Sequence, residues 1–262
     1  MRLAAFLAAA LFAAPALAST CFQLAQSGPR VMPAALTLAP DEVGVRFLGH
    51  AAFRITSPQG VSAVTDFAGF WGPGDPPDIV TMNKAHATHW TPAPDARIPH
   101  LLKGWGDGRV PQDHHADLGE MLVRNVPTDI RNRWDGGVEK YGNSIFVFEV
   151  EGLCIGHLGH LHHEPDDMQY AALGRLDVVM AAVDGGMTMD LPRMIRTLKR
   201  LKSSVVIPMH WFGPANLDRF LAGMADDFVI ENTGATSTLI GLRTLPDRPT
   251  VRVLRPRALS DP

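Results

Sequence analysis

From residue 43 onward the chain alternates between short apolar runs and turn residues. Three such runs, at 45–48, 52–55 and 61–64, are separated by Gly49-His50 and by Pro58-Gln59-Gly60. Apolar runs of this length between glycine and proline turns are typical of β-strands. The opening of the domain is therefore predicted to be a strand–turn–strand meander.

The same pattern continues downstream. Runs at 145–150 and 153–156 flank Glu151-Gly152, which predicts a β-hairpin. Further strands are expected at 78–81, 122–126, 178–183, 205–208 and 251–254, and helices at 166–173, 191–201 and 217–224. Asp190, ahead of Pro192, is the expected cap of the second helix. Residues 90–120 show no clear element. Meanders and a hairpin build antiparallel pairs, so a two-sheet α/β domain is expected rather than one doubly wound parallel sheet.

The first 18 residues read as a targeting segment. A basic start is followed by an apolar run and by Ala16-Leu17-Ala18, a small-residue cleavage site. We expect residues 1–18 to be a signal peptide cleaved after Ala18, which makes the mature protein periplasmic or secreted. The Pro- and Ala-rich stretch 19–42 reads as an irregular arm, and residues 43–262 as the domain.

Composition narrows the classes of partner. The chain has 24 basic and 27 acidic side chains and no long basic run, so nothing indicates nucleic acid as a partner. No membrane span is expected after cleavage. We expect a small-molecule substrate, and the sequence leaves the oligomeric state open. In an oxidising compartment Cys21 and Cys154 would form a disulfide that ties the arm to the sheet. Cys154 as a buried apolar filler is the alternative.

Histidines follow three of the predicted strands. His86 and His89 come after the strand at 78–81, His160 lies in a histidine-rich stretch after 153–156, and His210 ends the strand at 205–208. Ligands of α/β proteins gather at such strand ends. Neutral imidazole suits zinc and its neighbours in the first transition row. The spacing therefore predicts a metal site.

The motifs that carry these histidines resemble a known family. Gly49-His50-Ala51-Ala52-Phe53, Thr65-Asp66, the His86/His89 loop, Gly156-His157-Leu158-Gly159 and Ile207-Pro208-Met209-His210 occur in the order of the metallo-β-lactamase superfamily. The chain is most similar to the branch with ascorbate-6-phosphate lactonase and the N-acylethanolamine phospholipase D enzymes. The resemblance covers residues 43 to 212 and implies a four-layered αββα sandwich with the metal site at one edge of the two sheets.

This sequence departs from the family's ligand pattern. The family loop H-x-H-x-D-H reads Lys84-Ala85-His86-Ala87-Thr88-His89 here, so its first histidine and its aspartate are replaced. The middle histidine is missing, with Asp129 the nearest donor. The resemblance thus leaves His86, His89 and His210 as ligands, and His160, which stands where the family has a bridging aspartate, as a substituted ligand. Without that carboxylate, one metal is the simpler outcome, and three histidines with an open water position is a set that catalytic zinc uses.

Other residues have expected roles beside the ligands. Asp66 is expected to orient the ligand loop by hydrogen bonds, and Asp184 to act as a base or a replacement ligand. Asp66 and Asp184 are also the carboxylates best placed to move the proton. His50 is expected to be a hydrogen-bonded turn residue. Lys84 would neutralise an anionic substrate if it points inward, and otherwise lies on the surface.

Two functions follow from this set. The first is an exported hydrolase of an ester, lactone or phosphodiester that uses a water activated by one divalent metal ion, zinc in the first instance, with manganese or iron as alternatives. The second is a periplasmic binding or metal-binding protein that keeps the fold without the reaction. The changes at Lys84, Thr88 and His160 motivate the second.

Overall fold

The computed structural model of the chain describes residues 19–22, 41–132 and 134–256. The signal peptide predicted at 1–18 and most of the predicted arm lie outside the described residues. In the described part of the chain no helix is both long and apolar enough to cross a membrane.

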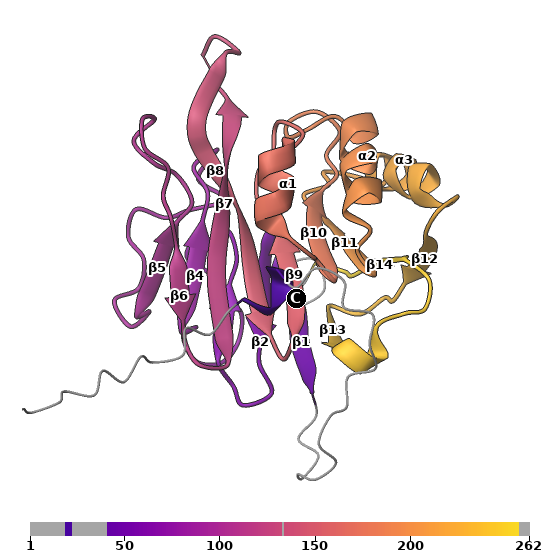
Figure 1. Cartoon of the computed structure of the whole chain (residues 1–262), viewed down its shortest axis with the longest axis horizontal. Helices are drawn as coiled ribbons and strands as arrows, with labels where there is room; N and C mark the ends of the chain where they lie inside the picture. Colours follow the sequence, from indigo (N-terminus) through magenta and orange to yellow (C-terminus); the bar gives the residue numbers. More distant parts are fainter. Residues whose placement is uncertain (1–18, 23–40, 133, 257–262) are drawn as a thin grey trace, which may run out of the picture.

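Two β-sheets pack face to face (Figure 1). The smaller sheet has the strand order β13-β1-β2-β3-β4-β5. Its strands are β1 (Glu42–Gly49), β2 (Ala52–Thr56), β3 (Ser62–Val64), β4 (Ile79–Met82), β5 (His100–Lys103) and β13 (Ser237–Gly241). β1 to β3 form the antiparallel meander that the sequence predicts.

The larger sheet has the order β12-β14-β11-β10-β9-β8-β7-β6. Its strands are β6 (His115–Asp117), β7 (Met121–Arg131), β8 (Val138–Val150), β9 (Leu153–His157), β10 (Val178–Ala182), β11 (Val205–Met209), β12 (Val229–Asn232) and β14 (Thr250–Val253). β8 and β9 form the predicted hairpin, and Glu151 and Gly152 both adopt positive φ in its turn. From β9 to β12 the pairing is parallel.

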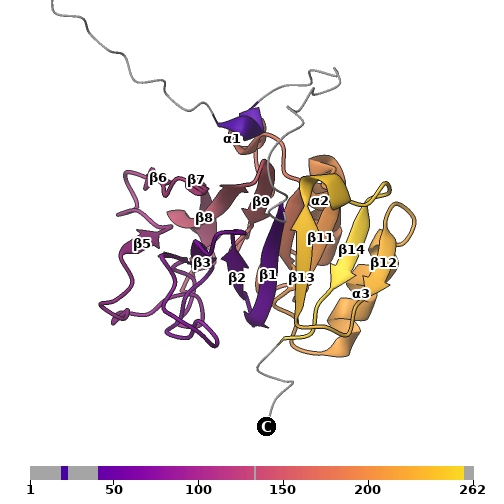
Figure 2. The ribbon, with the colours of Figure 1, turned by 90° about the horizontal axis from the view of Figure 1, so that it is seen from below.

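Three helices cover the larger sheet: α1 (Asp167–Leu173), α2 (Leu191–Leu201) and α3 (Pro214–Met224). α2 and α3 pack beside each other behind β11 and β14 (Figure 2), and α1 lies against β7. All three helices join the outward side chains of the larger sheet in one apolar cluster. Asp190 accepts a hydrogen bond from the Arg193 N–H at the start of α2, which confirms the expected cap. In the described residues, loops rather than a helix cover the smaller sheet, through Phe67, Ile98 and Trp71.

The main core lies between the two sheets. Inward side chains of β1 and β2 meet those of β8 to β11, and Phe47, Phe53 and Phe148 are fully buried there. β10 and β11 are buried on both faces, which is why their sequences read as unbroken apolar runs. The two-sheet sandwich predicted from the sequence is confirmed, and strand ends from both sheets meet at one edge.

Candidate metal centre

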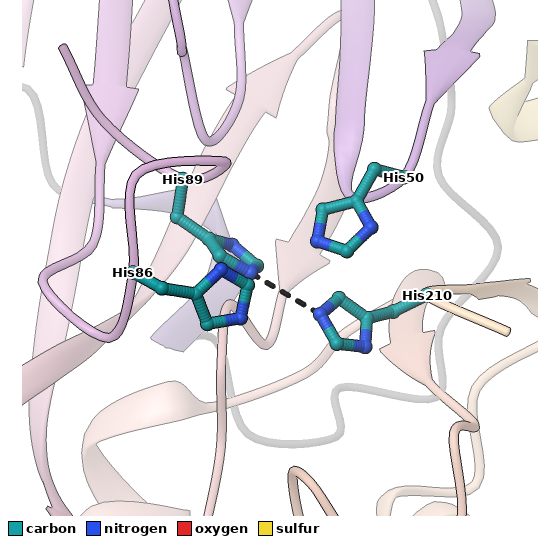
Figure 3. A group of neighbouring side chains, drawn as sticks. All are labelled: His50, His86, His89 and His210. Atoms are coloured by element: carbon teal, nitrogen blue, oxygen red, sulfur yellow. Dashed lines mark hydrogen bonds between the residues drawn. The ribbon is translucent and has the colours of Figure 1, made fainter. Parts of the chain in front are cut away.

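Four histidines converge at this edge: His50, His86, His89 and His210 (Figure 3). Each offers one ring nitrogen, and these nitrogens all lie within 4.8 Å of one another. His50 sits in the turn between β1 and β2, His86 and His89 follow β4, and His210 follows β11. Both sheets therefore contribute to the cluster.

The backbone holds these residues in uncommon conformations. His50, Asp66 and His210 have φ values of 53°, 42° and 58°, in the left-handed region that non-glycine residues rarely occupy. The His210 N–H donates to the His50 carbonyl at 2.8 Å, which ties the end of β11 to the β1–β2 turn. His157 fixes the same turn, because its buried ring donates from Nε2 to the Ala51 carbonyl at 2.8 Å. Such strain clusters at functional sites.

Two of the histidines are oriented by buried carboxylates. His89 Nδ1 contacts Asp66 Oδ2 at 2.5 Å, and His210 Nδ1 contacts Asp184 Oδ2 at 2.8 Å. Burial opposes the charge on Asp66, but the adjacent His89 and hydrogen bonds from His89 and Asn83 hold its pKa below the usual value. A neutral imidazole that donates from Nδ1 keeps its lone pair on Nε2. Both rings therefore present Nε2 as a ligand atom.

These two ligand atoms face each other. The Nε2 atoms of His89 and His210 are 3.3 Å apart (Figure 3). In neutral rings with Nδ1 on a carboxylate, both are acceptors, so a proton or a cation has to lie between them. Histidines bound to zinc characteristically donate their other N–H to a carboxylate. The donor set fits a metal ion.

Thr88 links the two remaining rings of the cluster. Its Oγ1 lies 2.6 Å from His86 Nδ1 and 2.9 Å from His50 Nε2. Burial and the neighbouring histidines lower the pKa of His50 to about 3 and that of His86 to about 4, so both rings are neutral near pH 7. The threonine therefore occupies the family's aspartate position as an orienting hydroxyl.

His160 lies beside this group. It follows Gly159, whose φ of 60° and contact with Asn83 and Asn143 leave no room for a side chain. The His160 N–H donates to Asn143 Oδ1 at 2.8 Å, and its ring Nε2 lies 3.0 Å from His86 Nε2. The four histidines predicted as ligands are thus brought together.

Asp184 has no free oxygen. Its Oδ1 accepts from the N–H groups of Gly186, Met187 and Thr188, and its Oδ2 accepts from Thr188 Oγ1 and His210. Burial opposes its charge, yet hydrogen bonds from His210 and Thr188 hold the pKa of Asp184 well below its usual value. Asp129, the nearest replacement for the missing family histidine, is engaged elsewhere, by Lys140 at 2.7 Å and the Tyr141 N–H at 3.0 Å.

A cavity of about 610 Å³ opens beside the cluster. Its lining comes from the loop after β4, the β7–β8 hairpin and the loops after β9 and β10: Lys84, Ala85, His86, Trp90, Ile130, Arg131, Asn132, Gly136, Glu139, His160, His162 and Met187. Lys84 forms an ion pair with Glu139 at this lining. It is therefore not a free cation in the cavity.

Sequence reasoning underrated His50 and His162. His50 appeared to be an ordinary turn residue, yet it belongs to the cluster. Its position at the end of β1, like that of the other histidines at strand ends, was the signal available. His162 lies in the histidine-rich stretch around His160, and nothing in that stretch distinguishes it, yet its Nε2 lies 2.6 Å from His160 Nδ1.

Comparison with known proteins identifies the family of the chain. The β-lactamase superfamily domain matches residues 44–210, and the chain belongs to this family, as its motifs predicted. A UPF0173 metal-dependent hydrolase of Pyrococcus horikoshii is 25% identical over 197 residues, 64% of this chain and 84% of the relative.

Two solved structures share the fold. A Thermotoga maritima protein of the metallo-β-lactamase superfamily superimposes with a TM-score of 0.54 at 24% identity, covering 81% of this chain and 98% of the other. Igni18, a metallo hydrolase from Ignicoccus hospitalis, gives a TM-score of 0.53 at 17% identity, covering 82% and 96%. The similarity to the lactonase and phospholipase branch stays a prediction.

Proposed function

We propose that the protein is a metal-dependent hydrolase that holds one divalent cation on His86, His89 and His210. The observation that carries the proposal is the pair of Nε2 atoms 3.3 Å apart, each on a ring whose Nδ1 contacts a buried carboxylate. The name of the Pyrococcus horikoshii relative, a metal-dependent hydrolase, supports the same class. His50 supplies a fourth nitrogen within reach.

One cation suits these residues better than two. A second cation close to the first needs a carboxylate to offset their mutual repulsion, and His160 stands where the family has that aspartate. The imidazole donors fit zinc, with manganese or iron as alternatives. A bound divalent cation would supply Lewis acidity, which polarises a substrate oxygen and acidifies water.

The chain's carboxylates serve to orient the ligands. The carboxylate oxygens of Asp66 and Asp184 each accept hydrogen bonds from a histidine and from neighbouring donors. They hold Nε2 of His89 and His210 toward the cation and strengthen these rings as ligands. They are thus poorly placed to move a proton, the role that their charge suggested.

The cavity favours an uncharged substrate. Trp90, Ile130 and Met187 give its wall an apolar character, and the ammonium of Lys84 is paired with Glu139. The guanidinium of Arg131, which also lines the cavity, is engaged by the carbonyl oxygens of Gly186, Met187 and Thr188. An ester or a lactone is the substrate class that fits best.

Metal analysis tests the proposal. The purified parent protein, loaded with zinc and desalted, should retain about one zinc per chain, and His89→Gln and His210→Gln should each lose it. Trp90→Phe, a lining variant outside the histidine cluster, is the matched control and should retain zinc. Hydrolysis of p-nitrophenyl acetate, a γ-lactone and bis(p-nitrophenyl) phosphate should stop with chelator and return with zinc, with the first two preferred.

The outcomes separate the candidate functions. A parent protein that retains no zinc, manganese or iron contradicts the proposal. Retained metal without turnover of any of the three substrates supports the alternative, a metal-binding protein that keeps the fold. This alternative is favoured by one observation: His160 stands where the family has its bridging aspartate.

We also propose that the protein is exported. The amino-terminal sequence supports this, and so does the disulfide between Cys21 and Cys154, a bond that persists in oxidising compartments.

A further inference from the structure

A one-way chain of hydrogen bonds leads into the site from the end of β7. It begins at the backbone N–H of Arg131, which lies 2.6 Å from His162 Nδ1. His162 Nε2 lies 2.6 Å from His160 Nδ1, and His160 Nε2 lies 3.0 Å from His86 Nε2. His160 and His162 are both buried.

The first donor fixes the direction of every hydrogen bond in this series. A backbone N–H can only donate, so His162 Nδ1 accepts and its hydrogen sits on Nε2. That N–H donates to His160 Nδ1, which places the hydrogen of His160 on Nε2 as well. Because Nδ1 accepts a hydrogen bond in both rings, it carries no hydrogen in either one, and both rings are therefore neutral.

We propose that His160 is an N–H donor to the substrate and not a ligand of the metal, with His162 as the positioning residue that holds it in this tautomer. The proposal rests on the proposed function. A ring nitrogen that carries a hydrogen has no lone pair for a cation. His89 and His210 are the opposite case, because their carboxylate partners keep Nε2 free.

The place of His160 gives its N–H a use. His160 and His86 both line the cavity of about 610 Å³. A lone pair of His86 that binds a cation no longer accepts a hydrogen bond, so the N–H of His160 then needs another acceptor. A substrate oxygen in the cavity is such an acceptor. The carbonyl oxygen of an ester or lactone gains negative charge during attack, and a fixed donor stabilises that charge.

This donor also inverts the chemistry that the family resemblance implies. A bridging aspartate is a negative acceptor that holds two cations together. A neutral N–H in its place repels a second cation and attracts an electron-rich oxygen. The substitution of this residue therefore exchanges a metal ligand for a substrate contact.

The tautomer can be observed directly. Long-range ¹H–¹⁵N correlation spectra of the parent, labelled on its histidines, should show the hydrogen of His160 on Nε2, both without metal and with zinc. Zinc should move the ¹⁵N chemical shifts of Nε2 in His89 and His210 to the values of a metal-bound nitrogen. The Nε2 of His160 should keep its hydrogen. His162→Phe removes the donor to His160 Nδ1, so His160 should change to a mixture of tautomers. His162→Gln, which keeps an N–H donor, should restore the parent tautomer.

Variants at position 160 supply the second readout. His160→Gln keeps an N–H donor, so it should bind zinc within about threefold of the parent affinity, whereas the matched variant His89→Gln should lose about 100-fold or more. His160→Leu should also keep zinc but lower kcat on p-nitrophenyl acetate about 100-fold with little change in KM, as expected for a lost oxyanion donor. His160→Gln should recover most of that loss. Circular dichroism checks that each variant is folded.

Each outcome decides the matter. A hydrogen on Nδ1 of His160, a zinc-induced ligand shift at His160, or a loss of zinc in His160→Gln as large as in His89→Gln overturns the inference. A parent that binds no metal contradicts the proposed function instead. The spectra of the metal-free protein then still test the tautomer of His160.

Discussion

Each histidine of the cluster takes its chemistry from the atom that its second ring nitrogen contacts. His89 and His210 contact carboxylates, which strengthen them as ligands, whereas Nδ1 of His86 contacts the hydroxyl of Thr88. A neutral hydroxyl polarises an imidazole less than a carboxylate does. We therefore regard His89 and His210 as the stronger ligands and His86 as the weaker one.

Acidification should destabilise the metal-free protein. The fold lowers the pKa of His50 to about 3 and those of His86 and His162 to about 4, chiefly by burial, from an ordinary value of 6.5. Between about pH 6.5 and 4 the unfolded chain binds more protons than the folded one. The free energy of unfolding should thus be highest above pH 6.5 and fall as the pH falls toward 4.

Urea unfolding in chelator from pH 4.5 to 8 measures this slope. His162→Gln removes one of the three groups and should make the slope shallower. A parent whose stability is the same at pH 5 and pH 7.5 would contradict the argument. Asp66 and Asp184, whose pKa values are depressed, add their own loss only in stronger acid.

At the scale of elements, the strands that carry the ligands were predictable because they are buried. β4, β10 and β11 are apolar at every position except Thr81, so their sequences stand out. β5, β6, β12 and β13 were missed, since they are short and only partly buried. They form by pairing with neighbours, and β13 pairs with β1, far away in the sequence. No local pattern reports such a pairing.

A second contact between residues far apart in the sequence, which no local pattern predicts, joins the end of β7 to the loop after β10. We call this contact the Arg131 clamp. Nη2 of the Arg131 guanidinium lies 2.7, 2.7 and 2.8 Å from the carbonyl oxygens of Gly186, Met187 and Thr188, which share its two hydrogens. N–H groups of that loop hold Asp184, which orients His210. Arg131 therefore steadies a ligand that it does not contact.

Replacing this clamp should weaken the metal site without dismantling it. Arg131→Met keeps the backbone N–H to His162 but removes the three guanidinium bonds. We expect zinc affinity to fall by about tenfold, the low end for residues that orient ligands, and stability to fall by about 1 kcal/mol. Arg131→Lys, with a single rotating ammonium, should lie between. Competition titration with a zinc-binding dye measures the zinc affinity of both variants. An Arg131→Met variant that binds zinc as tightly as the parent would contradict this role of Arg131.

At the scale of the whole molecule, the site exists only when both sheets are docked. His50, His86 and His89 come from the smaller sheet, and His160 and His210 from the larger one. The sequence located each strand end, but the meeting of His50 with His210 depends on the sandwich and on the left-handed turn at His50. Sequence patterns are local. They locate the histidines along the chain, and the family resemblance implies an orienting role for Asp66, but neither indicates that Asp184 contacts His210.

The disulfide is the covalent tie of this assembly. Cys21, in a short 3-10 helix at Thr20–Phe22, is bonded to Cys154 in β9 across 133 positions of sequence. Its carbonyl accepts from the Arg175 N–H at 3.1 Å, and the Phe22 ring lies 4.5 Å from the Arg124 guanidinium carbon. The segment thus docks near α1 at the start of β9, an inner strand of the larger sheet, and His160 follows the opposite end of that strand.

Removing this bond should lower stability but spare the site. Closing so long a loop restricts the unfolded chain, so the double variant Cys21→Ser/Cys154→Ser should lose about 2–5 kcal/mol of unfolding free energy. Reductant should lower the Tm of the parent toward that of the double variant and leave the double variant unchanged. Zinc content should stay the same in both, because none of the predicted ligands contacts the bond. A parent Tm that reductant does not alter would show that the bond contributes nothing to the stability of the fold.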